Sequence, residues 1–328
     1  MTALARGIGS RLGQAIGLLL AVVVVVFFLI QIAPGDAALY LAGDQGVGDA
    51  EFLAQVRADY GLDRPLLVQL GTYVGNVAQL DLGDSIYFNE PVLGLIVERL
   101  FATVLLAGTS LLFAVGLGVA IGVYTARRPE SSMSSAATVS SLVGFSTPVF
   151  YSAIMFIVLF AAKWSLLPVG GIEDVRYEGN WVGETIDLLQ HLILPALSLG
   201  IIYLAIYSRL ARASMLEVLE SDYIRTARAK GARERVVVYK HALRNAVIPV
   251  VTAAGLQVGN LLSGALLVEV VFACPGVGRL AVDSIFRRDS PTLLGIMIFS
   301  SAMVILANLL TDLVYRIIDP RIRVGGSR

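Results

Sequence analysis

The sequence predicts an all-α protein that crosses a membrane several times, and three observations support this prediction. Of the 328 residues, 56% are hydrophobic and only 15% are charged. Soluble globular chains carry about 25% charged residues, so this composition excludes a soluble domain, a disordered chain and a charged nucleic-acid-binding protein. The mean hydropathy is +0.77. The apolar residues also gather in six long stretches that are nearly free of Asp, Glu, Lys and Arg.

The six apolar stretches are interpreted as six transmembrane helices of one membrane domain. Each stretch is long enough to cross about 30 Å of hydrocarbon at about 1.5 Å per residue. The expected spans are residues 12–33, 100–125, 136–162, 189–210, 246–268 and 291–315.

The first span has a second interpretation, because Arg6 and Arg11 before an apolar run are also typical of a secretory signal peptide. We favour a retained helix. The apolar run is at the long limit for a signal peptide, and the sequence Ala-Pro-Gly-Asp that follows is a poor cleavage site.

Basic residues predict the orientation of the chain. Of the 25 Lys and Arg residues, 17 lie in the N-terminus, in the connections after the second and fourth spans, and in the C-terminal tail. The positive-inside rule places that side in the cytoplasm, so both termini are expected there. The formal net charge of zero is then the cancellation of a basic inner face and an acidic outer face.

The connection between the first two spans, residues 34–99, is expected outside the cytoplasm and is too long for a simple connector. Apolar side chains recur there at three- and four-residue steps, at Leu66, Leu70, Tyr73, Val74, Val77 and Leu80. Polar side chains fall on the opposite face, at Gln69, Thr72, Asn76 and Gln79. This spacing predicts an amphipathic helix that lies on the membrane surface.

The longest cytoplasmic connection, residues 211–245, has the order helix, glycine, helix. Ser221 or Asp222 can cap a first helix, Gly231 tolerates the positive φ that ends it, and a second helix is expected to run to about Asn245. Small residues among the basic ones permit close approach of another protein, and the arginines supply charge complementarity. On composition alone, these basic residues could equally enforce topology and bind anionic lipid.

At these residues the chain resembles the permease subunits of bacterial binding-protein-dependent ABC importers. The matching loop residues are Arg225-Thr226-Ala227, Gly231 and Ile248-Pro249, with Arg225 where the general motif has glutamate, as in the dipeptide, oligopeptide and nickel subfamily. Further motifs follow in order: APGD (33–36), YGLDRPLLVQ (60–69), LDLGDS (80–85), STPVF (146–150), EVVFACPGVGRL (269–280), RRDSPT (287–292) and DPRIR (319–323). The set is most similar to the first, B-type, permease of dipeptide and oligopeptide importers.

The resemblance implies the type I ABC importer permease fold in the bacterial inner membrane. It also implies partners: a second homologous permease, expected as a heterodimer, two cytoplasmic ATPases, and an extracytoplasmic substrate-binding protein. No nucleic acid is expected. Dipeptides or oligopeptides are the implied cargo, and a nickel chelate, glutathione, an opine or an oligosaccharide remain open as alternatives.

A coupling loop that contacts the ATPase is the site that the resemblance implies. Its residues are Arg225, Thr226, Ala227, Arg228, Lys230, Gly231, Ala232 and Arg233. The chain lacks the G-x-x-x-x-G-K-[ST] loop that binds ATP, so ATP and Mg are expected on the partner subunits, and this chain is expected to be non-catalytic. One cysteine and two histidines are too few ligands for a tetrahedral zinc site, and no metal is expected.

Polar residues within the spans are candidates for the pathway. Gln257, Asn260 and Ser263 share one face of the fifth span, where they could line the pathway or form hydrogen bonds between helices. Glu269 at the end of that span is interpreted as a gate or vestibule residue, or as the partner of Arg279 in an ion pair.

Other polar and special residues are assigned to local structure. Ser146-Thr147-Pro148 in the third span predicts a kink or a gate, because proline removes a backbone donor. Cys274 is expected to belong to a tight turn. His191 and His241 are expected to be isolated from each other and structural.

Two other functional classes are less well supported by the sequence. An ion-coupled secondary transporter would carry ionisable residues near the middle of its spans, together with internal repeats. A membrane enzyme would show a motif such as H-E-x-x-H or a serine and histidine constellation. The charges of this chain lie at the ends of its spans, and neither motif is present.

Overall fold

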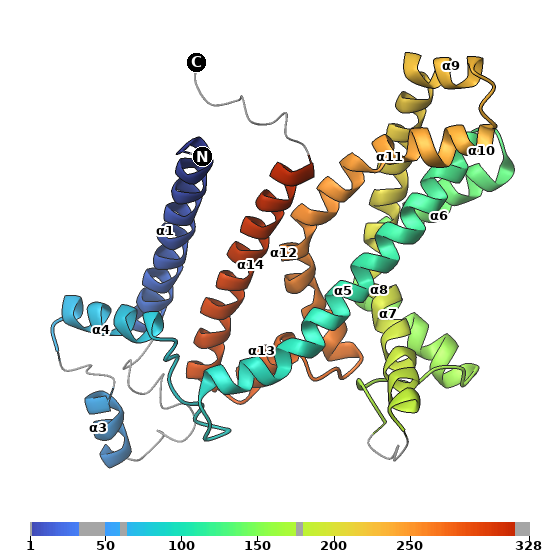
Figure 1. The fold of residues 1–328 in the computed structure, drawn as a ribbon. Coiled ribbons are helices and arrows are strands. Elements are labelled where there is room, and N and C mark those ends of the chain that lie inside the picture. Colours follow the sequence, from blue (N-terminus) through green and yellow to red (C-terminus); the bar gives the residue numbers. More distant parts are fainter. Residues whose placement is uncertain (1, 33–49, 60–63, 175–179, 319–328) are drawn as a thin grey trace. The chain divides into compact units, whose positions relative to one another are not determined.

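The computed structural model describes residues 2–32, 50–59, 64–174 and 180–318, and the described part is built from helices (Figure 1). The only β-type pairing within those ranges is an isolated bridge between Asp84 and Pro91. The prediction of an all-α fold is therefore confirmed. The chain divides into two units, Met1–Thr103 with Pro275–Leu309, and Val104–Cys274 with Leu310–Arg328.

The first unit is organised around the N-terminal helix. Its helices are α1 (Thr2–Ile32), α3 (Ala50–Asp59), α4 (Leu66–Ala78), the start of α5 (Val92–Arg127), α13 (Val277–Phe286) and most of α14 (Ser290–Ile318). Its core contains Val23 and Val26 of α1 with Leu294 and Ile298 of α14. Tyr73, Val74 and Val77 of α4 pack against this core.

The predicted amphipathic helix is present as α4, with two differences. Gln69, expected on the exposed face, is buried because α4 packs on α1. Its side chain is satisfied there, since it accepts a hydrogen bond from Gln31 of α1 at 2.9 Å and donates one to the Arg64 carbonyl at 2.7 Å. Leu80, expected on the apolar face, lies beyond the helix at a φ of 63° and is 66% exposed.

The second unit is organised around α8 (Trp181–Leu219), which packs against α6 (Ser132–Ser146), α7 (Val149–Phe156) and α12 (Ile248–Val271). Between α7 and α8 lies the π-helical η2 (Ile157–Lys163). Glycine allows α5 to approach α8 closely, since a Cβ at Gly122 would lie 2.5 Å from the Cβ of Ala211. Such small-residue contacts are typical of helices packed in membranes.

Four helices of the described part are long and apolar enough to cross a membrane. They are Arg11–Leu29, Val92–Arg127, Trp181–Leu219 and Ser290–Thr311, at the first, second, fourth and sixth expected spans. The fifth expected span coincides with α12, which has 24 residues.

The third expected span, residues 136–162, is not one continuous helix. Helix α6 ends at Ser146, and α7 begins at Val149. Thr147 and Pro148 between them are extended, with ψ of 126° and 139°. The reason is local, because proline lacks an N–H donor and disfavours helical geometry in the residue before it. The number of spans, six, stays a prediction.

Candidate functional site: the loop between α8 and α12

The loop that follows α8 forms two short arms. The first arm is α9 (Asp222–Ala229), and the second contains α10 (Glu234–Val236), η3 (Val237–Ala242) and α11 (Leu243–Ala246) (Figure 1). The predicted order of helix, glycine, helix is confirmed. Ser221 is the N-cap residue of α9 by its backbone, but its hydroxyl donates a hydrogen bond to the Val218 carbonyl instead of capping the helix.

Gly231 ends α9 in a Schellman turn. Its φ is +77°, its N–H donates to the Arg228 carbonyl at 2.9 Å, and the Ala232 N–H donates to the Ala227 carbonyl at 3.2 Å. These two bonds satisfy carbonyls that the helix end would otherwise leave unpaired. Glycine suits this position because the left-handed conformation costs other residues about 1–2 kcal/mol.

One face of α9 is seated on the rest of the unit. Ile224 is fully buried in a cluster with Val123 and Ala126 of α5, Met215 of α8, and residues of the second arm. Burying a side chain of this size stabilises a packed arrangement by about 1.5–3 kcal/mol. Helix α9 is therefore packed onto the ends of the long helices.

The predicted coupling residues divide between the two faces of this loop. Six are exposed: Arg225, Thr226, Arg228, Lys230, Gly231 and Arg233. Ala227 and Ala232 are partly buried and pack against the Ile224 cluster. These two alanines therefore pack within the loop itself, and the approach of a partner to them stays a prediction.

An ion pair connects the two arms across Gly231. Arg228 donates to both carboxylate oxygens of Glu234, from Nη2 to Oε1 at 2.9 Å and from Nε to Oε2 at 3.2 Å. The hydrogen bond from Arg228 holds the pKa of Glu234 below its ordinary value. By contrast, Arg225 and Asp222 approach only to 3.6 Å at a highly exposed position, and such pairs contribute little.

A second polar contact joins the beginning of α9 to the end of the second arm. Asn245 Nδ2 lies 2.7 Å from the Tyr223 hydroxyl and donates to it. Neither this contact nor the Arg228–Glu234 pair was anticipated, because the partners are 22 and six residues apart and meet only once the Gly231 turn is formed.

The candidate pathway residues lie in or beside α12 and α6. Gln257 is half-buried, whereas the side chains of Asn260 and Ser263 lie outside the described part. Glu269 is fully buried in the last turn of α12. Arg279, its predicted partner, lies in α13, where its Nε is 3.9 Å from Asp283. The pathway roles stay predictions.

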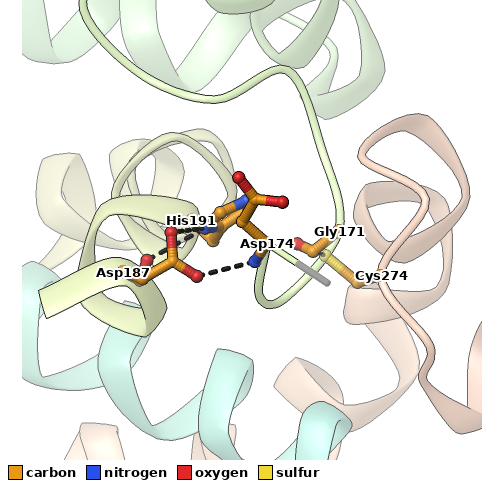
Figure 2. A network of polar contacts seen from close by, with 5 residues as sticks. All are labelled: Gly171, Asp174, Asp187, His191 and Cys274. Atoms are coloured by element: carbon orange, nitrogen blue, oxygen red, sulfur yellow. Dashed lines mark hydrogen bonds and ion pairs between the residues drawn. The ribbon is translucent and has the colours of Figure 1, made fainter. Parts of the chain in front are cut away.

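His191 has an acidic neighbour that the sequence interpretation overlooked. Figure 2 shows its Nδ1 beside Asp187, 3.3 Å from the carboxylate and 2.9 Å from the backbone oxygen. The other carboxylate oxygen of Asp187 accepts a hydrogen bond from the Asp174 N–H at 2.7 Å. The i, i+4 spacing of the pair on one helix was the signal that could have identified it.

The loop after η2 is also fastened to the end of α12. Gly171 donates its N–H to the Phe272 carbonyl at 2.8 Å, and the Cys274 thiol lies 3.6 Å from the Gly171 oxygen (Figure 2). A Cβ at Gly170 would lie 2.3 Å from the Phe272 oxygen. Asp187 and Cys274 therefore contact the loop after η2, and His191 contacts Asp187 within α8. Structural roles for His191 and Cys274 stay predictions.

Comparisons with known proteins identify related chains over nearly the whole length. Residues 118–324 match the family described as binding-protein-dependent transport system inner membrane component, and residues 4–107 match the N-terminal family of such components. The chain is 41% identical over 330 residues to the dipeptide transport system permease protein DppB of Escherichia coli strain K12, covering 95% of this chain and 97% of that one.

Two further relatives and one solved structure are similar. The chain is 39% identical to the di/tripeptide transport system permease protein DppB of Pseudomonas aeruginosa strain UCBPP-PA14, covering 96% and 98% of the two chains. It is 38% identical to the oligopeptide transport system permease protein AppB of Bacillus subtilis strain 168, covering 94% and 96%. The fold resembles a chain of the inward-facing MetNI methionine ABC transporter, with a TM-score of 0.53 and 18% identity over 69% of this chain and 96% of that chain.

Proposed function

Since this chain belongs to the family of binding-protein-dependent transport system inner membrane components and is the permease subunit of an ABC importer, we propose that it imports dipeptides or oligopeptides. It would form half of the translocation pathway, and a second homologous permease would form the other half. The cargo assignment is supported by the names of relatives that are about 40% identical over nearly the full length.

The remaining subunits would supply energy and selectivity. Two cytoplasmic ATPases would bind ATP and Mg, because this chain has no phosphate-binding loop. A substrate-binding protein would deliver the cargo on the outer side. The excess of basic residues in the loop after α8 supports a location in the inner membrane with both termini in the cytoplasm.

The observation that carries the mechanism is the geometry of α9. Ile224 is buried on one face of the helix, whereas basic residues beside it and at the C-cap, such as Arg225 and Lys230, are exposed. A helix held in this way offers a charged surface to a partner and is itself packed onto the transmembrane helices. We propose that this surface seats in a groove of the ATPase, whose closure on ATP would then drive alternating access. Such coupling requires contacts that differ between the two states.

In the same mechanism, Gln257, Asn260 and Ser263 would line part of the pathway on α12. The break at Thr147 and Pro148 would let α6 and α7 move as separate segments. Glu269 would act at the gate.

Cysteine crosslinking in the assembled complex tests the contact with the ATPase. In a Cys274→Ala background, Arg225→Cys is expected to crosslink to cysteines placed around the ATPase groove. The matched control, Leu166→Cys, is 66% exposed and lies in the predicted outer loop, so it is expected to give no crosslink. The contact is disproved if Arg225→Cys forms none while transport is normal.

A second experiment tests the cargo. The complex is reconstituted in liposomes with the cognate binding protein, and uptake of labelled dipeptides and oligopeptides is measured. ATP-dependent peptide uptake is expected. Tight binding and uptake of a nickel chelate, glutathione, an opine or an oligosaccharide, with none of a peptide, would overturn the peptide assignment and retain the importer.

A further inference from the structure

We propose that four side chains form a brace that carries movement of α9 into α12. The α9 brace consists of Tyr223 and Arg228 on α9, with Asn245 and Glu234 on the second arm. Its members are positioning residues, and the inference rests on the proposed docking of α9 on the ATPase.

A tie across the turn is needed because the two arms are joined by a glycine. A chain that turns at Gly231 has wide conformational freedom there, and no atom lies within 4 Å of a Cβ built on it. If this turn bent, α9 could move relative to the second arm, and its movement would not reach α12. The Schellman bonds hold the turn, but they act only on the last residues of α9.

The first tie is at the end of α9. The planar guanidinium of Arg228 makes two parallel bonds to Glu234, and a bidentate pair restricts orientation as well as distance. The side chains are 42% and 54% exposed, so the pair adds only modest stability. Its importance is geometric, because it fixes the angle between the two arms.

The second tie is at the start of α9. The Tyr223 hydroxyl accepts the hydrogen bond from Asn245, which lies three residues before the first residue of α12. Helical hydrogen bonds continue through this junction, from Val247 N–H to the Leu243 carbonyl and from Val251 N–H to the Val247 carbonyl, both at 2.9 Å. The second arm and α12 therefore form one nearly continuous helical rod.

Ile224 lies between the two ties, in the buried cluster. Helix α9 thus has a polar contact with the second arm near each end, and Ile224, directly after Tyr223, packs against that arm as well as against α5 and α8. The alternative route runs through Glu220 and Ser221 into α8, whose Met215 shares the buried cluster with Ile224, but among the described hydrogen bonds none joins a side chain of α9 to a side chain of α8. The geometry therefore favours α12 as the helix that moves with α9.

A charge-swap cycle tests the first tie in the reconstituted complex. Arg228→Glu and Glu234→Arg are each expected to lower the amount of substrate transported per ATP by about two- to fivefold, the range that an exposed ion pair supports. The double variant R228E/E234R restores the pair, and its amount of substrate transported per ATP is expected to return to near the wild-type value. Arg235→Glu, an exposed charge change in the same segment, is the matched control and is expected to keep the ratio.

Two further readouts separate this proposal from the docking itself. Crosslinking from position 225 to the ATPase should persist in every brace variant, so its loss would indicate failed docking. The distribution of distances between spin labels at Thr226 and Val251 is expected to broaden in Tyr223→Phe and in Arg228→Glu. Unchanged transport per ATP in the single variants, a narrow distance distribution in both, or no recovery in the swap would each overturn the brace.

Discussion

The carboxylate of Asp289 accepts a hydrogen bond from the hydroxyl of Ser85, a residue 204 positions earlier in the chain. The same carboxylate accepts from the Thr292 hydroxyl at 2.7 Å and from the Ile86 N–H at 3.4 Å. Asp289 is only 1% exposed and directly precedes α14, where the helix dipole favours a negative charge. Two motifs that are remote in sequence, LDLGDS and RRDSPT, therefore form one buried joint.

Asp289→Asn should destabilise the first unit. The amide nitrogen can donate but not accept, so at least one of the three donors loses its partner, at a cost of about 2 kcal/mol. We expect a lower melting temperature of the purified protein in detergent. Asp84→Asn changes an exposed carboxylate of the same motif and should melt like the wild type. Equal melting of all three proteins would contradict the joint.

Gly231→Ala should weaken the turn that follows α9. Space is available for a methyl group, so the expected cost of about 1 kcal/mol comes only from the left-handed φ of +77°. Gly231→Val should cost more, because a β-branched residue is disfavoured further at positive φ. Proteolysis of the loop in the purified complex measures the effect. Resistance to proteolysis is expected to be highest for the wild type, lower for Gly231→Ala and lowest for Gly231→Val. The reverse order would refute this account.

Ala273→Gly should strengthen the turn that ends α12. Helix α12 ends in the same kind of turn as α9, with the Cys274 N–H donating to the Glu269 carbonyl, but Ala273 holds the left-handed position at a φ of 53°. Glycine there should raise stability by about 1 kcal/mol. Ala120→Gly is a matched change at an exposed position within α5, where glycine should cost a similar amount. The melting temperatures should therefore move in opposite directions.

Gly170→Ala should detach the loop after η2 from the end of α12. The new Cβ would lie 2.3 Å from a backbone oxygen, which cannot rotate away, and we expect a loss of about 1–3 kcal/mol. Cys274, the chain's one cysteine, is 3% exposed and reports the change. Its labelling by a maleimide should accelerate in Gly170→Ala and not in Gly94→Ala, where a Cβ meets no neighbour.

Acidification should loosen the Arg228–Glu234 tie. Hydrogen bonding to Arg228 lowers the pKa of Glu234, so this pair's contribution to stability is fully present above the ordinary value of 4.5 and is lost as the pH falls through the lowered one. The distance distribution between labels at Thr226 and Val251 should broaden over that range. In Glu234→Gln the distance distribution should be broad already at neutral pH and should change little on acidification. A wild-type distribution that stays narrow at low pH would count against the tie.

Features that depend only on residues close together in the sequence were predictable from it. Hydropathy identified the long helices, because the cost of burying charge in a membrane is a property of each local stretch. Pro148 marked the interruption of the third span, and Gly231 marked the end of α9, because both act through their own backbone geometry. The i, i+4 pair of Asp187 and His191 was equally local and was missed only because histidine was considered alone.

What only the tertiary structure decided is which side chains meet. Ser85 and Asp289 share no local pattern, and Gln69 is buried only because α4 packs on α1 beside Gln31. Arg228 finds Glu234, among several charged neighbours in the loop, through the particular angle of the Gly231 turn. Hydropathy and backbone propensity act along the chain, whereas these contacts depend on how packed helices bring distant segments together. The sequence by itself therefore determined a polytopic permease with a basic loop, and the packing determined how that loop is attached to α12.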